Sequence, residues 1–343
     1  MKKFAVLLSL ITMCLSVSDA SGDNYYITSG SARARALAMG SAYSSISDNF
    51  SSGFYNPGAF KVNAAHGERS FRIFLNPVCP AVGLREYSKY DLDFDKDNEL
   101  TSGEILRSLS TVVKGAVFST PFLDIGVGLW EEVIPGDTLA VKNSRFFSSE
   151  NMSQYAFHSA FGAIKIAETI SLGFTGTLYN RRYNGTSSYK SGYTFGIILN
   201  PNPKMKVGIA YNYMPDGFTN ARLGLESLEN ETITSGISLY PDQNTVVSID
   251  LRNLTRENLT SSREIHTGIE KRIIDHVALR AGYYRKKATQ DDVLSFGIGI
   301  LPRKVNKNRF ETSSRNDTIT YTVILEEDGF KRRWHMLSLL LRY

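Results

Sequence analysis

The sequence predicts an all-β fold, a transmembrane antiparallel β-barrel of about fourteen strands, from three observations. Apolar and polar residues alternate with a period of two through most of the chain. Candidate strands such as 152–167 and 169–183 span 16 and 15 residues, whereas strands of globular sheets usually have about 5–6. The alternation also continues to the last residue, since Leu339, Leu341 and Tyr343 share one face. A tilted strand that crosses a bilayer needs about 9–11 residues, so these lengths favour a membrane barrel over a two-sheet sandwich.

The composition excludes several other classes of protein. The 343 residues are 42% hydrophobic, and beyond the N-terminus no apolar run approaches the about 18 residues of a transmembrane helix. Two cysteines exclude a disulfide scaffold. The net charge of +5 is spread along the chain, without the basic runs typical of nucleic-acid binding. The 18 Tyr and 19 Phe, against 2 Trp, indicate a β-leaning chain.

The first twenty residues have the pattern of a secretory signal peptide. Lys2 and Lys3 give a positive start, residues 4–17 are apolar, and Ser18-Asp19-Ala20 is a cleavage site with small residues at its ends. The apolar part is too short to span a bilayer. Cleavage leaves Cys79 as the only cysteine of the mature chain, so an intramolecular disulfide is excluded.

The two faces of the candidate strands differ in chemistry. In 204–214 and 276–285, one face is apolar and the other carries polar residues and glycine. In 264–270, the polar face carries Glu264, His266 and Glu270. Such faces fit either a sandwich or a barrel, and a closed barrel leaves none of these long strands with an exposed edge.

Fourteen candidate strands, an even number, place both chain ends on the periplasmic side. The strands are 79–89, 111–120, 123–133, 152–167, 169–183, 189–199, 204–214, 231–240, 244–255, 262–272, 275–286, 291–302, 316–326 and 331–343. Connections on the periplasmic side are short, as at 121–122 and 241–243, whereas outer connections such as 90–110 are mostly longer. This alternation fails at 303–315 and at some tight outer turns, so twelve strands are the alternative.

A segment rich in small residues precedes these strands and carries a family resemblance. Residues 31–60 read SARARALAMGSAYSSISDNFSSGFYNPGAF. They resemble the N-terminal signature of the FadL-type long-chain fatty-acid transporters and the related PorV and PorQ outer-membrane proteins. The matching residues are Arg35, Met39, Gly40, Ala42, Tyr43, Asp48, Asn56 and Pro57. The chain departs from the signature at Ala38 and Ser41, where the signature has glycine, and at Asn49, where it has an acid, and Gly58-Ala59 inverts its Ala-Gly order. Residues 265–284 and 296–300 are similar to the end of the family's barrel.

The resemblance implies a luminal hatch over residues 21–66, inside a barrel formed by residues 67–343 in the bacterial outer membrane. Small side chains fit a lumen, and Asn56-Pro57 favours an extended turn because a residue before proline avoids the α region. Arg35 and Asp48 are expected to pair with each other or with charges on the wall. The wall candidates are Asp250, Arg252, Glu270 and Arg280. With Met39 and Gly40, these hatch residues either only hold the hatch or also gate the barrel.

Two functions are implied for such a barrel. One is passive transport of hydrophobic small molecules across the outer membrane, through a gap in the hatch or in a wall strand kinked at Gly126 and Gly128. The other is a non-transporting PorV- or PorQ-like partner of a protein secretion machinery. A soluble exported β-protein is a third reading. The expected partners are outer-membrane lipid, the outer-membrane assembly machinery, and either a hydrophobic solute or secretion-system components.

No residue pattern predicts an enzyme. The five histidines have no paired metal spacing, and neither GxSxG nor a phosphate-binding loop occurs. We therefore expect no catalytic residue, no organic cofactor and no nucleic-acid partner. The C-terminal Leu339, Leu341 and Tyr343 instead look like an outer-membrane insertion signal.

An acidic loop at residues 93–104 has the spacing of an EF-hand calcium site. Its candidate ligands at positions 1, 3, 5, 7, 9 and 12 are Asp93, Asp95, Asp97, Glu99 (through its carbonyl), Thr101 and Glu104. Asn98 stands where glycine is usual, although asparagine tolerates the left-handed conformation. The spacing predicts Ca²⁺ in this first outer loop, and the alternative is a solvated acidic loop.

Overall fold

A single curved β-sheet organises the chain in the computed structural model. The structure describes residues 24–29, 34–47, 51–59, 69–75, 113–135, 152–167, 169–183, 186–214, 231–254, 263–274, 276–286, 290–300, 319–326, 332–339 and 341–342. The three short helical elements are α2 (Ala34–Ala38), α3 (Ser52–Tyr55) and η1 (Pro57–Ala59). Within this part of the chain, no helix is long and apolar enough to cross a membrane.

The described residues form sixteen strands, which all belong to this sheet. They are β1 (Asn24–Ser29), β2 (Ser70–Leu75), β3 (Val113–Ser119), β4 (Leu123–Pro135), β5 (Met152–Ala167), β6 (Ile170–Tyr183), β7 (Thr186–Asn202), β8 (Met205–Tyr213), β9 (Glu231–Leu239), β10 (Thr245–Arg252), β11 (Glu264–Ile274), β12 (Val277–Arg285), β13 (Asp292–Ile300), β14 (Ile319–Glu326), β15 (Arg332–Leu339) and β16 (Leu341–Arg342). The predicted long strands are confirmed, since β5, β6 and β7 have 16, 14 and 17 residues.

The strands from β2 to β15 lie beside one another in chain order, each antiparallel to the next. Thirteen of them, β3 to β15, correspond to predicted strands, whereas β2 is not among the predicted ones. The short strand β16 follows β15 after one residue and pairs with β2 through Leu341↔Leu75 and Arg342↔Phe74. The C-terminal segment therefore pairs with β14 along β15 and with β2 at its end.

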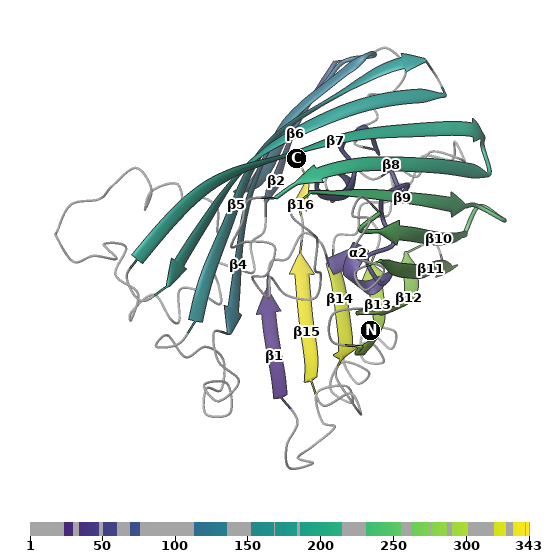
Figure 1. Ribbon diagram of the computed structural model, residues 1–343. Helices are drawn as coiled ribbons and strands as arrows, with labels where there is room; N and C mark the ends of the chain where they lie inside the picture. The colour runs from purple at the N-terminus through teal and green to yellow at the C-terminus, as the bar shows by residue number, and fades with distance from the viewer. Residues whose placement is uncertain are drawn as a thin grey trace.

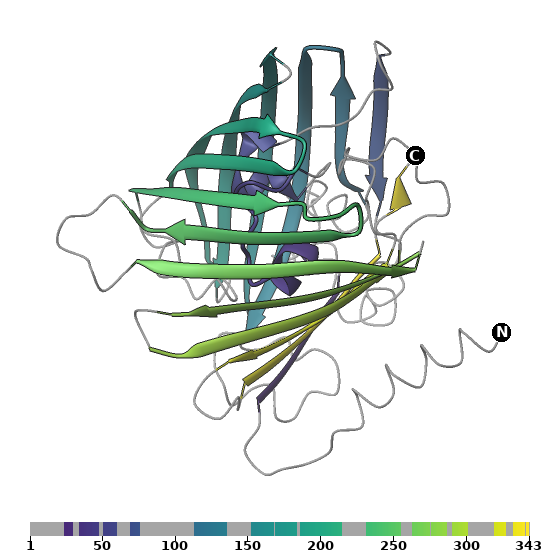
Figure 2. The same cartoon turned by 90° about the vertical axis from the view of Figure 1, so that its right-hand side faces the viewer.

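The two faces of this sheet differ as the alternation predicts. Large apolar side chains on the convex face are exposed; among them are Ile125, Val127, Leu172, Phe195, Ile209, Ile237, Leu251, Ile269, Leu279 and Phe296. The opposite face is buried and polar, with Thr175, Asn212, Ser238, Asp250, Arg252, His266, Glu270 and Arg280. Figures 1 and 2 show this face curving around the purple N-terminal elements α2 and α3.

The structure differs from the prediction near the N-terminus. β1, inside the predicted luminal range 21–66, lies in the sheet and runs parallel to β15 from Asn24↔Arg332 to Ser29↔Leu337. Sequence alternation could not predict this pairing. Alternation shows on which face of a strand a residue lies, but not which other strand pairs with the second edge of β15. The first antiparallel strand is β2, while the predicted strand 79–89 lies outside the described residues. The signal peptide also lies outside them.

The gap expected in the wall at Gly126 and Gly128 of β4 is not seen. β4 pairs with β5 in an unbroken register from Leu123↔Ile164 to Pro135↔Met152, through both Gly126 and Gly128. On its other edge, β3 pairs with it from Ser119↔Asp124 to Gly115↔Gly128. Because the ladder continues on both sides, these glycines open no gap in the wall. The close contact of Gly126 with the Phe161 ring gives a packing reason for glycine at this position.

Candidate functional site: the plug segment and its wall contacts

Residues 34–47 and 51–59, here called the plug segment, lie against the concave face of the sheet. Every one of them is buried except Phe54, which is half-buried. The segment has little regular structure of its own: α2 and α3 have five and four residues. Buried backbone groups need hydrogen-bond partners, and here the wall side chains supply many of them.

A charged cluster fixes the start of the plug segment. Arg35 Nε and Nη2 donate to the two carboxylate oxygens of Glu270 at 2.9 and 3.0 Å. Arg280 Nε donates to the same carboxylate at 2.7 Å. The side chains of all three residues are at most 7% exposed. The expected pairing of Arg35 with wall charges is therefore confirmed, with Glu270 as its partner on β11 and Arg280 opposite on β12.

A second pair of wall charges binds the backbone of the plug segment. Asp250 Oδ2 accepts hydrogen bonds from the backbone N–H groups of Tyr43 and Ser44, both at 2.8 Å. Arg252, two residues on along β10, donates from Nη2 to the carbonyl oxygen of Ser41. Its guanidinium also lies over the Tyr55 ring, 5.6 Å from the centroid. A wall anion thus meets backbone donors, and a wall cation meets a backbone acceptor.

His266 lies between the plug segment and a further charged wall residue, Glu264. Its Nδ1 lies 2.7 Å from the carbonyl oxygen of Gly40, and its Nε2 lies 3.1 Å from Glu264 Oε2. Both ring nitrogens thus face oxygen atoms, one on the plug segment and one on the wall. The ring stacks on Tyr284 at 4.2 Å between centroids.

Wall hydroxyl groups complete the polar contacts of α2 and the turn after it. Gly40 N–H donates to Ser295 Oγ at 3.0 Å, and Ser295 Oγ donates to the carbonyl oxygen of Ala38 at 3.2 Å. Thr322 Oγ1 donates to the carbonyl oxygen of Ala34 at 2.8 Å. Ser295 thus supplies a partner for the carbonyl of Ala38, one of the last four of the helix, which has no acceptor role within the helix.

Asn56 bridges the second half of the plug segment to two wall strands. Its Nδ2 lies within hydrogen-bonding distance of three carbonyl oxygens, those of Ser44, Ile197 and Ile209, at 2.7, 3.0 and 3.3 Å. Its Oδ1 accepts from the backbone N–H of Gly58 at 2.9 Å. Asn56 has the extended backbone that the following proline favours, with φ −158° and ψ 103°. The Asn-Pro pair thus links both parts of the plug segment to β7 and β8.

A row of wall glycines lets the plug backbone approach the sheet. Three cross-strand pairs form it: Gly173↔Gly196, Gly208↔Gly236 and Gly268↔Gly282. A methyl group at these positions meets the plug segment: Pro57 and Gly58 at Gly173, Asn56 and Pro57 at Gly196, Ser44 at Gly208 and Gly236, Met39 at Gly268, and Met39 and Gly40 at Gly282. Sequence analysis did not single out this glycine row, although the period of two places its members on polar faces.

The turn between α2 and Ala42 shows the effect of one departure from the family signature. Gly40 and Ser41 both have left-handed backbones, with φ 59° and 61°. A Cβ at Gly40 would lie 2.7 Å from the carbonyl oxygen of Thr267 and 2.8 Å from the nitrogen of Tyr283. Glycine is therefore required at position 40. Ser41 adopts a conformation that favours glycine, which is the residue that the signature has there.

The interior of the plug segment is apolar. Met39 belongs to a buried cluster with Ala36, Tyr43, Ile46, Tyr55, Tyr240 and Val246, against which Phe54 packs. The Tyr43 and Tyr55 rings lie 5.4 Å apart between centroids. Tyr240, which follows β9, and Val246, in β10, are wall residues. The plug segment is therefore held to the wall by apolar packing as well as by polar contacts.

The structure brings together most of the predicted hatch residues. Arg35, Met39, Gly40, Asn56 and Pro57 all lie in the plug segment and touch the wall. Asp48 lies outside the described residues, as do Tyr343 and all six predicted calcium ligands: Asp93, Asp95, Asp97, Glu99, Thr101 and Glu104. In the part of the chain that is described, no three His, Cys, Asp or Glu side chains are grouped as a metal site.

Comparison with known proteins gives similarities to solved structures alone. A scan against models of protein families finds no match. A search of curated proteins finds none either. The chain is similar in fold to the toluene transporter TbuX of Ralstonia pickettii, with 11% identity and a TM-score of 0.45 over 85% of this chain and 91% of that one. It is also similar to the toluene transporter TodX of Pseudomonas putida, with 11% identity and a TM-score of 0.47 over 88% of this chain and 93% of that one. The CymD monoaromatic hydrocarbon channel is similar with 13% identity and a TM-score of 0.47, over 85% of this chain and 92% of that one.

Identities and TM-scores this low carry no statement about function. The function proposed below therefore rests on the contacts of this chain.

Proposed function

We propose that the protein is a plugged β-barrel of the bacterial outer membrane that passes small hydrophobic molecules passively. The observation that carries this proposal is the arrangement of the sheet: an exposed apolar outer face, a polar inner face, and a bonded segment on that inner face. Lipid suits the outer face, because a membrane barrel alternates apolar residues outward and polar residues inward. On the inner face, Glu270 is paired with Arg35 and Arg280, and Asp250 and Arg252 bind backbone groups of the plug segment, as charges away from water need such partners.

The plug segment argues against a wide water-filled pore. Its backbone contacts wall strands from β6 to β14, through Thr175 at one end and Thr322 at the other. A solute must therefore pass by displacement of the plug segment or through the wall. An apolar solute can use the second route because it is soluble in the lipid outside.

The weakest place in the described wall is the seam between the two ends of the sheet. Among the described residues, two pairs join β16 to β2, whereas β14 and β15 share eight. The added strand β1 is held along β15 by a parallel ladder, and parallel pairing is slightly less stable than antiparallel pairing. We therefore place the wall route at this seam.

A reversible cross-link tests this function. The mature chain with Cys79→Ser receives Leu75→Cys and Leu341→Cys, which are Cα partners across the seam. A matched control places cysteines at Phe296 and Val323, Cα partners within the continuous wall. Uptake of a labelled monoaromatic hydrocarbon and of a long-chain fatty acid is measured in a host lacking its own transporters, with and without reductant.

We expect the wild type to take up at least one probe, the seam cross-link to block uptake, and reduction to restore it. The control cross-link should leave uptake unchanged. If correctly inserted wild-type protein gives no uptake, transport is overturned and the secretion-partner alternative becomes the one to test. Equal uptake with the seam locked and unlocked would assign passage to displacement of the plug segment.

A further inference from the structure

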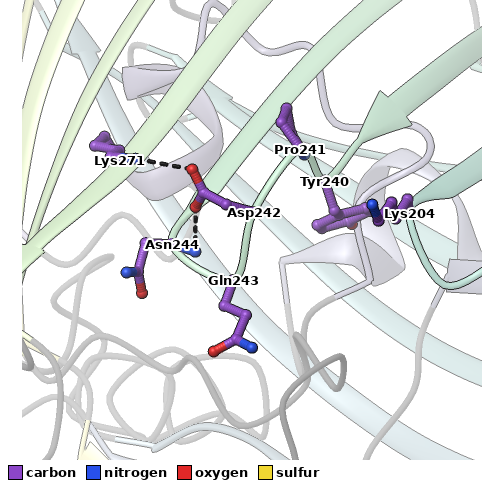
Figure 3. A pocket seen from close by; sticks show the side chains of 7 residues that line it. All are labelled: Lys204, Tyr240, Pro241, Asp242, Gln243, Asn244 and Lys271. Carbon is purple, nitrogen blue, oxygen red and sulfur yellow. Dashed lines mark hydrogen bonds and ion pairs between the residues drawn. The ribbon is translucent and has the colours of Figure 1, made fainter.

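A pocket lies beside the turn that connects β9 to β10. Its volume is about 450 Å³, and it is lined by Lys204, Tyr240, Pro241, Asp242, Gln243, Asn244 and Lys271. In Figure 3, Asp242 lies between Lys271 and the backbone of Asn244, and Lys204 lies beyond Tyr240 on the other side of the turn. The turn after β7, the turn after β9 and the strand β11 thus contribute to one pocket.

Asp242 supplies a carboxylate to the pocket, and this carboxylate is already hydrogen-bonded. The Asp242 carboxylate already accepts from Lys271 Nζ at 3.0 Å, from the backbone N–H of Asn244 at 2.7 Å and from Thr245 Oγ1 at 2.8 Å. The hydrogen bond from Lys271, followed by that from the Asn244 backbone, lowers the pKa of Asp242 to about 2. Its carboxylate is therefore ionised at neutral pH and satisfied within the turn.

The two lysines retain donors for a ligand. Lys271 Nζ donates to Asp242 and, at 2.7 Å, to Thr245 Oγ1, which leaves one of its three N–H groups. The ammonium group of Lys204 makes no ion pair with any residue in the described ranges. Two ammonium groups against one carboxylate leave the pocket with one net positive charge.

The pocket lies where the apolar outer face ends. Lys271 lies on the same outward face of β11 as Ile269 and Ile273, whose side chains are 43% and 59% exposed. Leu239, directly before the pocket residue Tyr240, is 44% exposed. A lysine at this boundary can keep its stem on apolar surface and its ammonium group at headgroup level. The strands thus offer a surface for acyl chains directly next to a cationic pocket.

We propose that this pocket binds the phosphate of an anionic phospholipid, whose acyl chains lie on the outward faces of β9, β10 and β11. This inference rests on the outer-membrane placement proposed above. A phosphodiester carries one negative charge and accepts hydrogen bonds, which matches the charge and the spare donors of Lys204 and Lys271. Tyr240 links the pocket to the plug segment, because it lines the pocket and also packs in the buried cluster with Met39 and Tyr43.

The first test measures binding of short-chain phosphatidylglycerol to the purified full-length mature protein in neutral detergent, by calorimetry and by melting temperature. The variant Lys204→Gln with Lys271→Gln removes both ammonium groups from the pocket. A matched control, Lys190→Gln with Arg263→Gln, removes two exposed charges elsewhere. Since a lysine near an anionic lipid surface contributes about one kilocalorie per mole, we expect the pocket variant to bind about thirtyfold more weakly and the control to bind like the wild type.

A second variant separates binding from folding of the turn. Asp242→Asn keeps a side-chain oxygen for the Asn244 N–H group and removes the negative charge from the pocket. We expect it to bind phosphatidylglycerol several-fold more tightly than the wild type, which a purely structural role of the turn does not predict. sn-Glycerol 3-phosphate and inorganic phosphate serve as probes that carry phosphate without acyl chains.

Each outcome decides the inference. Tight binding of phosphatidylglycerol that is lost in the pocket variant supports it. Equal affinity of the pocket variant and the wild type overturns it, as does equal affinity of inorganic phosphate and phosphatidylglycerol, which would show a site for free phosphate. Wild-type protein that takes up solute but does not bind phosphatidylglycerol refutes this inference alone. Protein that binds the lipid but carries no solute refutes only the transport function.

Discussion

Arg35 and Glu270 form a two-bond ion pair, at 2.9 and 3.0 Å, between the plug segment and β11. They are separated by 235 residues in the chain, and the side chain of each is less than a tenth exposed. Because the same carboxylate also accepts from Arg280, Glu270 holds two cations with one charge. Because the carboxylate is shared, removing Glu270 and removing Arg35 should change the free energy of unfolding by different amounts.

We expect Glu270→Gln to destabilise the protein more than Arg35→Met. The first change leaves two buried guanidinium groups without their carboxylate and should lower the free energy of unfolding by about 3–5 kcal/mol. The second leaves Glu270 paired with Arg280 and should cost about 1–3 kcal/mol. Denaturant unfolding in detergent measures both, and protease cleavage within 34–59 reports release of the plug segment. Equal losses would contradict a shared carboxylate.

The glycine row makes a prediction with its own control on one strand. Gly173→Ala puts a methyl group into the backbone of Pro57 and Gly58, whereas a methyl group at Gly176 meets only the Phe174 ring, at 3.7 Å. We expect Gly173→Ala to cost about 1–3 kcal/mol, as overpacking does, and to expose residues 51–59 to protease. Gly176→Ala should leave both properties unchanged. The same protease pattern in both variants would show that close approach does not explain the glycine at position 173.

Ser41→Gly should stabilise the protein. Ser41 has a left-handed backbone with φ 61°, and its buried Oγ makes no hydrogen bond with the described residues. Glycine removes both costs, although it loses more backbone entropy on folding, so we expect a net gain of about 0.5–1 kcal/mol. Gly40→Ala, next to it, should destabilise because its Cβ would overlap the wall backbone. An unchanged or lower unfolding midpoint for Ser41→Gly would rule out strain at this turn.

The turn beside the pocket should weaken in acid. Hydrogen bonds from Lys271 and from the Asn244 backbone lower the pKa of Asp242 from 3.8 to about 2. A lowered pKa contributes stability above the ordinary value, and this contribution is lost as the pH falls through the folded value. The melting temperature of the wild type should therefore exceed that of Asp242→Asn above about pH 4, and the difference should close towards about pH 2. A difference that persists at the acid end would contradict this assignment.

Calcium binding by the acidic loop stays a prediction. The EF-hand spacing of residues 93–104 predicts calcium affinity in the range of extracellular sites, about 10⁻⁴–10⁻³ M. The double change Asp97→Ala and Glu104→Ala removes ligands at positions 5 and 12 and should abolish binding. Calorimetry on detergent-solubilised protein compares it with the wild type, and equal calcium uptake by both would show a solvated acidic loop.

Much of the sheet could be predicted because the two faces of a strand appear in the sequence as alternating apolar and polar residues. The period of two separates Ile209 on the exposed face from Gly208 and Ala210 on the buried face, and the predicted strand at 204–214 appears as β8. The polar face of β11 likewise carries the predicted Glu264, His266 and Glu270, all buried. The identity of the outer and inner faces follows from side-chain chemistry alone.

The sequence by itself determined the all-β class, the long strands and the presence of Arg35, Asn56 and Pro57 in a segment distinct from them, because these features are local. Only the tertiary structure decided that Glu270 holds Arg35, that paired glycines admit the plug backbone, and that β1 joins β15 in parallel. Alternation gives the face on which each residue lies but not its register against a distant segment. Which atoms meet across more than two hundred residues depends on the course of the whole sheet through space.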